Sequence, residues 1–351
     1  MAQRTVPAIS REELLDRVNR LPRVPFAHLP TPLEEMPRLR EALGPRAPRL
    51  LVKRDDLTGF ALGGNKVRHL EYRLADIRAQ GADTIIVANV AQSNHARLHA
   101  ALAARFGLTT YILKIPSHKD TPVNGNLLLD HIVGARIVEA SSADPAVVDR
   151  ELDELAARLE DEGRRVYNVP KHPSCKSDGS IAYLAAAVEL LGQLEERGLR
   201  ADHLFLAAGT SSGGLALAGK VLGEPYRVHA VSVGGSREQV TALVCDAANG
   251  AAERLGLDAR LEPADISVYD EYVGERYGVP TPACLEAIRL AGRTEGLILD
   301  PVHTAKAFSA LIDQVRRGTI GPDETVVFVH TGGIPITFAY SEEILAGLAG
   351  A

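Results

Sequence analysis

From residue 50 onward, short runs of strand-forming residues alternate with stretches in which apolar residues recur at helical spacing. We expect strands at residues 50–53, 84–90, 109–114, 135–140, 165–170, 202–209, 226–235 and 325–333, with helices between most of them. This alternation favours an α/β fold in which parallel sheets are covered by helices on both faces. In open α/β sheets, ligands bind beyond the carboxyl ends of the strands, so functional residues should directly follow the strands.

The composition argues against several classes of partner. Acidic residues outnumber basic ones, 45 to 39, for a formal charge of −6. Proteins that bind nucleic acids or membrane surfaces favour a basic face, so we expect neither partner. No stretch approaches the ~20 apolar residues of a membrane span, and the N-terminus has no signal peptide pattern. Cys175, Cys245 and Cys284 form no disulfide or metal-binding pattern, so we expect no metal and a cytoplasmic location.

Lys66 stands at the expected start of a helix, after two glycines and Asn65. The partial positive charge at a helix N-terminus disfavours a protonated amine, which would help to keep this lysine nucleophilic. A solvated lysine in the first turn of a helix is the alternative interpretation. The letters GGNK alone do not decide between the two.

Residues 92–95 (QSNH) place four hydrogen-bonding side chains in a row between a strand and a helix. Ser93 or Asn94 could simply cap the helix, which is the commonest role of such residues there. The same helix start could instead bind an anion such as a substrate carboxylate. Four polar side chains exceed what a cap requires, and this favours the functional interpretation.

Residues 206–219 (LAAGTSSGGLALAG) lead from a strand through a loop of Gly, Ser and Thr into a helix. Small residues let backbone N–H groups approach a phosphate, and the helix dipole adds to the attraction. The segment lacks the Gly-Lys-Ser/Thr of a Walker loop and the GxGxxG of a dinucleotide fold, so a nucleotide-dependent oxidoreductase is a remote alternative. A plain tight turn is the other alternative.

The C-terminal third contributes further polar residues near the ends of expected elements. They are Tyr272, Tyr277, His303, Thr304 and Thr331. Each of them could be structural, as a lone His or Tyr in a loop usually is.

Taken in order, these segments resemble one enzyme family. KRDDLTGFALGGNK, QSNHAR, GTSSGG, EYVGERYGVP, DPVHTAKA and HTGG together resemble the D-cysteine desulfhydrase and 1-aminocyclopropane-1-carboxylate deaminase family, from about residue 28 to Tyr340. The resemblance implies the cofactor pyridoxal 5′-phosphate (PLP) and the tryptophan-synthase β-like fold, called fold type II. It also implies a role for individual residues.

The implied roles fall into three groups. Lys66 would bond covalently to PLP and later carry the α-proton, Tyr277 would be one of two active-site tyrosines, and His303 occupies the position of the other. Ser93 and His95 would hold the substrate carboxylate, with Asn94 bonded to the phenolate oxygen of the cofactor. Residues expected to contact other parts of the cofactor are Gly209, Thr210, Ser211, Ser212 and Gly213 at the phosphate, and Thr304 and Thr331 at the pyridine nitrogen.

Two segments depart from the family pattern. His303 and Ala305 stand where most relatives have Tyr and Gly, and residues 170–180 (PKHPSCKSDGS) replace a Gly-rich turn. A histidine titrates near neutral pH and can act as acid or base at the β-carbon of a substrate. Lys171, His172 and Lys176 could help to accommodate a second negative charge, or could merely be solvated.

We therefore expect two αβα domains with twisted, parallel-type sheets and PLP in the cleft between them. A small domain at residues 69–168 would be inserted into a large one, 1–68 plus 169–351, and the family analogy implies a homodimer. The expected activity is α,β-elimination from a small β-substituted amino acid such as D-cysteine, releasing pyruvate, ammonia and the leaving group. The alternatives are deamination of 1-aminocyclopropane-1-carboxylate, cleavage of L-cysteate, and a PLP-binding homologue without this activity.

Overall fold

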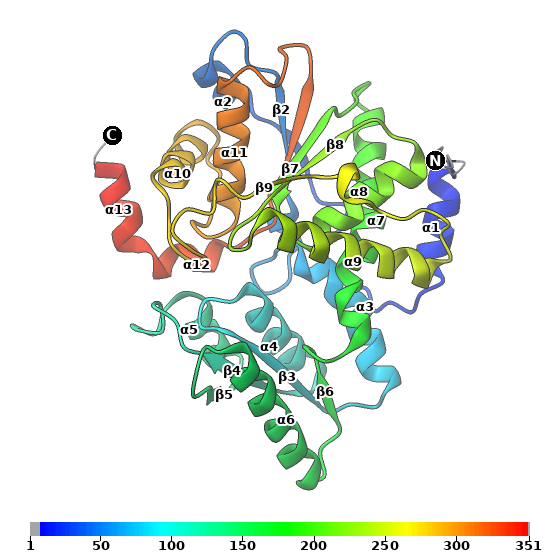
Figure 1. The fold of residues 1–351 in the computed structure, drawn as a ribbon, viewed down its shortest axis with the longest axis vertical. Coiled ribbons are helices and arrows are strands. Elements are labelled where there is room, and N and C mark those ends of the chain that lie inside the picture. The colour runs from blue at the N-terminus through cyan, green and yellow to red at the C-terminus, as the bar shows by residue number, and fades with distance from the viewer. Residues whose placement is uncertain (1–7, 350–351) are drawn as a thin grey trace.

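Two sheets organise the chain in the computed structural model, which describes residues 8–349 (Figure 1). The larger sheet has six strands in the order β1-β2-β10-β7-β8-β9, and the smaller has four in the order β5-β4-β3-β6. The larger sheet contains β1 (Leu33–Glu35), β2 (Arg49–Lys53), β7 (His203–Ala207), β8 (Arg227–Val231), β9 (Ser267–Tyr269) and β10 (Thr325–Val329). The smaller contains β3 (Thr84–Val90), β4 (Thr109–Ile115), β5 (Arg136–Glu139) and β6 (Val166–Asn168).

All strand pairs are parallel except β1 with β2. In the large sheet β10 lies between β2 and β7, with Val327 opposite both Leu51 and Leu204. The carboxyl ends of these three neighbours therefore share one edge of the sheet. The loops that follow them, which carry the GGNK, GTSSGG and HTGG segments, are brought together there.

Helices cover both faces of each sheet, as their buried apolar residues require. One face of the large sheet is covered by α1 (Arg11–Asn19), α7 (Asp178–Glu195), α8 (Thr210–Leu222) and α9 (Arg237–Leu255), and the other by α2 (Pro37–Leu43), α10 (Pro282–Glu295) and α11 (Thr304–Arg316). The small sheet packs against α3 (Lys66–Ala79) and α4 (Asn94–Phe106) on one side and α6 (Pro145–Asp161) on the other, and α5 (Gly125–Ile132) packs against α4. The chain ends with α12 (Ile334–Ala339) and α13 (Ser341–Ala349).

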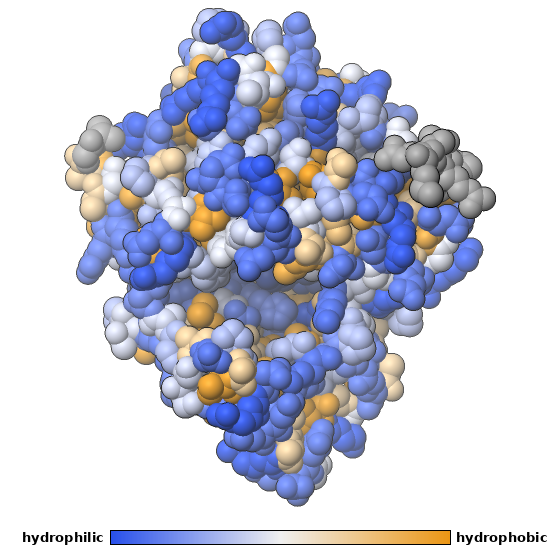
Figure 2. Space-filling view, in the orientation of Figure 1, coloured by the Kyte–Doolittle hydropathy of each residue, from blue (hydrophilic) through white to orange (hydrophobic). Residues whose placement is uncertain are grey.

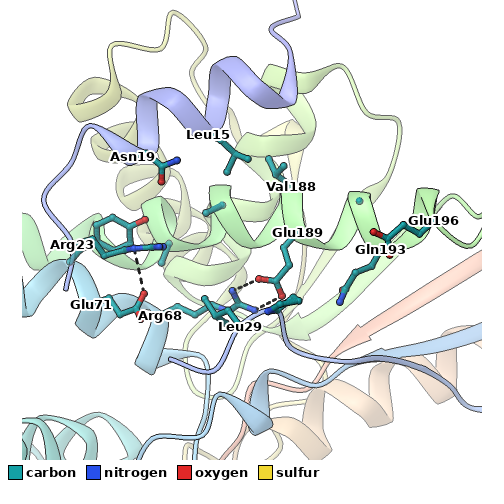
Figure 3. A pocket seen from close by; sticks show the side chains of 15 residues that line it. Leu15, Asn19, Arg23, Leu29, Arg68, Glu71, Val188, Glu189, Gln193 and Glu196 are labelled. Carbon is teal, nitrogen blue, oxygen red and sulfur yellow. Dashed lines mark hydrogen bonds and ion pairs between the residues drawn. The ribbon is translucent and has the colours of Figure 1, made fainter. Parts of the chain in front are cut away.

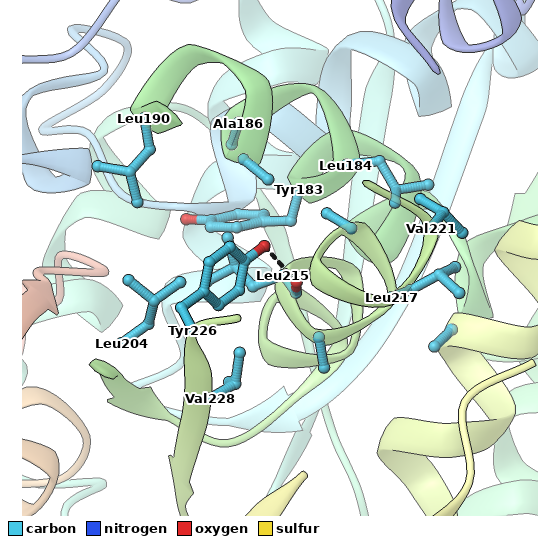
Figure 4. Packing of buried hydrophobic residues seen from close by; sticks show 14 of the residues in the cluster. Tyr183, Leu184, Ala186, Leu190, Leu204, Leu215, Leu217, Val221, Tyr226 and Val228 are labelled. Carbon is cyan, nitrogen blue, oxygen red and sulfur yellow. Dashed lines mark hydrogen bonds between the residues drawn. The ribbon is translucent and has the colours of Figure 1, made fainter. Parts of the chain in front are cut away.

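The largest apolar cluster lies between the large sheet and helices α7 and α8 (Figure 4). Tyr226 packs in this cluster, and its hydroxyl donates a 2.8 Å hydrogen bond to the Leu215 carbonyl. Burial raises the pKa of Tyr226 far above its ordinary value, so the side chain stays a neutral donor. This core holds α8 firmly against the sheet edge where the functional loops meet.

The structure confirms the α/β class and the expected strands, and it adds elements that the sequence patterns did not predict. These are chiefly α1, α2, α9, β9 and the antiparallel strand β1. A division into residues 69–168 and the two flanking segments stays a prediction, and positions 1–7 and 350–351 of the expected large domain lie outside the described residues. Within residues 8–349, no helix combines the length and apolarity needed to cross a bilayer.

Candidate active site

Lys66 is the first residue of α3, as the sequence predicted. The chain reaches it through Gly63 and Gly64, which have φ angles of +67° and +118°. A Cβ on Gly63 would lie 1.9 Å from the Asp56 carbonyl oxygen, so only glycine fits there. The next residue, Asn65, donates its backbone N–H to the Thr331 carbonyl over 3.0 Å. The two glycines thus let the loop that precedes Lys66 lie directly against the loop after β10.

A cavity of about 270 Å³ lies between the two sheets. Its lining combines residues from α3 and α4 with the loops that follow β7 and β10, and the surface is recessed between the two lobes in Figure 2. Eight of the predicted site residues line it: Lys66, Asn94, His95, Gly209, Thr210, Ser211, His303 and Thr331. Ser93, Ser212, Gly213, Tyr277 and Thr304 do not line this cavity, although each adjoins a residue that does or bonds to one.

The environment of Lys66 favours the neutral form of its amine. Burial lowers its pKa to about 8, the nearby Asp300 carboxylate opposes this shift, and Arg97 adds to it. A lysine whose pKa lies near neutrality carries a substantial fraction of free amine, which is the nucleophilic form. The structure therefore favours the functional interpretation of Lys66 over a solvated lysine.

The polar segment at residues 92–95 both caps α4 and faces the cavity. Ser93 Oγ accepts hydrogen bonds of 3.2 Å from the backbone N–H groups of His95 and Ala96, so the predicted capping role is real. Its hydroxyl proton remains available to a ligand. The side-chain oxygen Oδ1 of Asn94 accepts a 2.9 Å hydrogen bond from the side-chain amide of Asn126. This bond leaves the Asn94 amide free to donate.

The Gly/Ser/Thr loop forms the N-terminus of α8. Ser212 Oγ closes the loop by donating to the Gly209 carbonyl over 2.7 Å, and it accepts from the Gly209 N–H over 3.2 Å. A Cβ on Gly209 would meet nothing within 4 Å, so open space lies over this end of the helix. The first backbone N–H groups of a helix have no intrahelical acceptor and attract anions. Gly213 instead packs against α9, where a Cβ would lie 2.8 Å from the Val244 carbonyl oxygen.

The C-terminal residues divide into a cavity group and a structural group. His303 lines the cavity, and its Nε2 lies 3.2 Å from the Tyr277 hydroxyl. Thr304 is buried and donates its hydroxyl to Asp300 Oδ2 over 2.9 Å. Tyr272 lies away from this cavity, where its hydroxyl donates to Asp313 over 2.6 Å. Tyr272 is therefore structural.

The sequence analysis did not single out two cavity residues on α3 and one buried carboxylate beside His303. His69 and Arg73 stand three and seven residues after Lys66 and line the same cavity, with His69 Nε2 3.2 Å from Ser211 Oγ. Helical spacing from Lys66 was the signal that could have found them. Asp300, which the DPVH segment contains, is fully buried beside His303.

The altered segment at residues 170–180 contributes little charge to the cavity. Lys171 pairs with Asp149 at 2.6 Å and Asp153 at 3.1 Å on α6, and the ring of His172 stacks on Tyr167. From this segment it is Cys175 that lines the cavity. Neither Lys171, His172 nor Lys176 lines the cavity, so the suggestion that these three residues accommodate a second negative charge of the substrate loses its support.

A larger cavity, of about 470 Å³, lies between α1, α3 and α7 (Figure 3). Most of its charged groups are paired: Arg68 with Glu189 at 2.9 Å and with the neighbouring Asp55 at 2.8 Å, and Arg23 with Glu71 at 3.7 Å. Buried charges need such partners, and paired groups are not available to a reacting substrate. The smaller cavity at Lys66 is therefore the candidate active site.

The arrangement defines a class of enzyme. An amine of lowered pKa and an anion-binding helix start face one cavity, which fits a cofactor that carries both an aldehyde and a phosphate. The pattern of the family described as "Pyridoxal-phosphate dependent enzyme" matches residues 24–332, and this chain belongs to that family. Its cofactor is PLP, as predicted.

More specific similarity is found to individual proteins. The chain is 37% identical over 336 residues to the D-cysteine desulfhydrases of Salmonella typhimurium and Salmonella typhi, and the match covers 94% of this chain and 99% of each relative. A crystal structure titled as that of an ACC deaminase homologue superposes with a TM-score of 0.85 at 34% identity, covering 95% of this chain and 99% of the other. These similarities confirm the predicted family and its fold type.

Proposed function

We propose that this protein catalyses PLP-dependent α,β-elimination from a small β-substituted amino acid such as D-cysteine. With D-cysteine, one substrate molecule and one water would yield pyruvate, ammonia and hydrogen sulfide. The observation that carries the proposal is the shared cavity of Lys66, the α8 N-terminus and His303. One cavity would thereby hold a base for the α-proton, a site for the cofactor phosphate and a proton-transfer group for the β-carbon.

The proposed division of labour follows from the contacts of each residue. PLP supplies the electron sink that makes the α-proton removable. Lys66 would hold the cofactor and then carry the α-proton, because burial lowers its pKa to about 8 and a substantial fraction of its amine is free near neutral pH. Within the loop from Gly209 to Gly213, the backbone N–H groups of Thr210, Ser211 and Ser212 would hold the phosphate, because those of Gly209 and Gly213 already donate inside the loop. Ser211, whose hydroxyl accepts 2.9 Å from the Asn65 side-chain amide, is already oriented.

Substrate recognition is proposed for the start of α4. The Ser93 hydroxyl, the Asn94 amide and the His95 ring lie at the N-terminus of a helix, where the dipole favours a carboxylate. Burial, together with His99 and Arg73, holds the pKa of His95 well below its ordinary value. His95 would therefore act as a neutral hydrogen-bonding partner. Thr331 and Thr304 are proposed to lie near the pyridine nitrogen. The position of Thr304 is fixed by its hydrogen bonds to Asp300.

A second candidate is the ring opening of 1-aminocyclopropane-1-carboxylate, because the superposed crystal structure is titled as a deaminase homologue. The family resemblance implies that the ring-opening deaminases use a Tyr and an acidic residue at the positions where this chain has His303 and Thr304. Thr304 is committed to Asp300 and offers no carboxylate. We therefore propose little or no deaminase activity.

A substrate panel on the purified protein tests the proposal. D-cysteine, β-chloro-D-alanine, L-cysteate and the cyclopropane amino acid would be assayed for pyruvate or 2-oxobutyrate, with Lys66→Ala as the inactive control. Pyruvate from D-cysteine or β-chloro-D-alanine supports the proposal. Efficient 2-oxobutyrate release would replace it with the deaminase, and pyruvate from L-cysteate alone would replace D-cysteine with an anionic substrate. Activity on none of the four would identify a homologue without this chemistry.

A homodimer is also proposed, on the family analogy. Light scattering after gel filtration should give twice the chain mass of 37.6 kDa. A mass equal to one chain would refute it.

A further inference from the structure

Asp300 is a fully buried carboxylate surrounded by donors. Oδ1 accepts from the backbone N–H groups of Val302 and His303 at 3.0 and 2.8 Å, and Oδ2 accepts from the backbone N–H and hydroxyl of Thr304 at 3.1 and 2.9 Å. Oδ1 also lies 3.0 Å from His303 Nδ1. Burial alone would raise the pKa of Asp300, but the attraction of His303 and these hydrogen bonds outweigh it and keep the pKa below its ordinary value.

An ionised carboxylate can only accept, so its bond to His303 fixes the position of a ring proton. Nδ1 must carry a hydrogen, whether the imidazole is neutral or charged. Nε2 is then the nitrogen that gains or loses a proton. That nitrogen lies 3.2 Å from the Tyr277 hydroxyl, and the two rings meet edge to face at a centroid distance of 5.8 Å.

We propose that Asp300 is a positioning residue of a three-member proton relay, Asp300–His303–Tyr277, which delivers the proton to the departing β-substituent. The inference rests on the proposed elimination activity and deepens it. A carboxylate that holds an imidazole by Nδ1 fixes its orientation and stabilises its charged form, the arrangement that activates nucleophiles and metal ligands in other enzymes. In this chain the group that faces Nε2 of the imidazole is the phenol of Tyr277.

The relay conserves protons and electrons. In the charged form, His303 Nε2–H donates to the Tyr277 oxygen, which leaves the phenolic proton free to point to the substrate. When the β-substituent leaves, its bond to carbon breaks with the electron pair on the departing atom. The phenolic proton passes to that atom, and the proton on Nε2 replaces it on Tyr277. Solvent returns one proton to His303 before the next turnover, and Lys66 releases the α-proton to solvent, so the cycle consumes no net proton.

The position of Tyr277 suits this role. It lines a second cavity, of about 390 Å³, whose lining also includes His118, Lys119 and Arg276, and its hydroxyl contacts His303 of the active-site cavity. Its side chain is 40% exposed. The phenol therefore stands between the His303 side of the active site and a space open to solvent. A leaving group that Tyr277 protonates would become neutral beside the second cavity, through which it could diffuse to solvent.

Other titratable groups around the relay must be considered in any pH measurement. Lys66, His69 and Arg73 on α3 and His95 on α4 line the cavity that His303 faces. Burial, followed by Lys66 and Arg73, holds the pKa of His69 well below its ordinary value, and that of His95 is also lowered. These two histidines therefore stay neutral across the physiological range.

The tautomer of His303 can be read without any substrate. In a histidine-labelled ¹⁵N spectrum of the holoenzyme near pH 8, His303, assigned with His303→Gln, should show hydrogen on Nδ1. His330 is the internal reference, because its Nε2 lies 2.9 Å from the Ile298 carbonyl and its Nδ1 accepts from the Gly332 N–H, which fixes the opposite tautomer. Hydrogen on Nε2 of neutral His303 would overturn the relay even if the enzyme is active.

The pH profile then tests whether Asp300 acts through His303. The relay predicts that kcat/KM falls as His303 loses its proton, and that Asp300→Asn moves this alkaline limb to lower pH by about one unit or more, because a neighbouring carboxylate favours the imidazolium. In His303→Gln the limb should vanish. Adding Tyr277→Phe to His303→Gln should cost much less than Tyr277→Phe alone. An unmoved limb in Asp300→Asn, with additive losses in the double variant, would show that Asp300 merely caps α11. Inactive wild-type protein with the predicted tautomer would refute the proposed function and not the geometry.

Discussion

Ser93 has two potential roles, and they can be separated by comparing substitutions. As the N-cap of α4, its Oγ accepts two 3.2 Å hydrogen bonds from backbone N–H groups. Ser93→Ala should therefore cost about 1 kcal/mol of stability, whereas glycine at an N-cap costs only a few tenths. In a chain of this size, a loss of about 1 kcal/mol lowers the melting temperature by roughly 1 to 4 °C.

The proposed contact with the substrate carboxylate adds a second loss, which appears only in activity. A buried charged group deprived of one partner loses about 1 to 3 kcal/mol, which corresponds to a decrease in kcat/KM of about 5- to 150-fold. Because both Ser93→Ala and Ser93→Gly remove the hydroxyl, both should show this decrease, but Ser93→Gly should melt close to the wild type.

The assays are differential scanning fluorimetry and steady-state kinetics on the same preparations. Ser236→Ala is the matched control, because Ser236 caps α9 with a 3.4 Å bond from the Gln239 N–H and does not line the cavity. It should lower the melting temperature and leave kcat/KM near the wild-type value. Wild-type kcat/KM in Ser93→Gly would refute the substrate role and leave Ser93 as a helix cap only.

Three further predictions concern the cofactor and the substrate. Borohydride should fix PLP on the peptide that contains Lys66 in the yellow holoenzyme, and label on another lysine would contradict its assignment. Because burial lowers the pKa of Lys66 to about 8, attachment of PLP to the apoenzyme should accelerate about tenfold per pH unit up to about pH 8 and then level off. A rate that keeps rising to pH 10, as for an exposed lysine, would show an unperturbed amine. The cyclopropane amino acid should give little 2-oxobutyrate, and efficient release that persists in His303→Ala would overturn the assigned role of His303.

The local parts of the fold could be read from the sequence. A strand such as residues 84–90 and the start of α3 at Lys66 depend on nearest neighbours: β-branched runs, glycines and helical spacing. Such signals act over a few residues, so they predict elements well. Strand β1 has only three residues and its antiparallel pairing with β2 is a tertiary contact, so no local pattern announced it. Helix α9 carries much of its buried surface on alanines, which are a weak apolar signal.

The candidate site divides in the same way. The family resemblance carried by the motifs implied the cofactor. The predicted site residues make up half of the cavity lining, because loops after parallel strands meet at one edge of a sheet. Folding decided which groups came within bonding distance: the Ala96 N–H and Ser93 Oγ at 3.2 Å, Lys171 and Asp149 at 2.6 Å, and Thr304 and Asp300 at 2.9 Å.

The contact between Tyr277 and His303 joins residues 26 positions apart, and it exists only because the loop before α10 folds over the start of α11. The residue types could therefore be read from the sequence, whereas their hydrogen-bonding partners could not. Residue type and local spacing are properties of the sequence, whereas a hydrogen bond depends on a distance and an angle that only the packed structure determines.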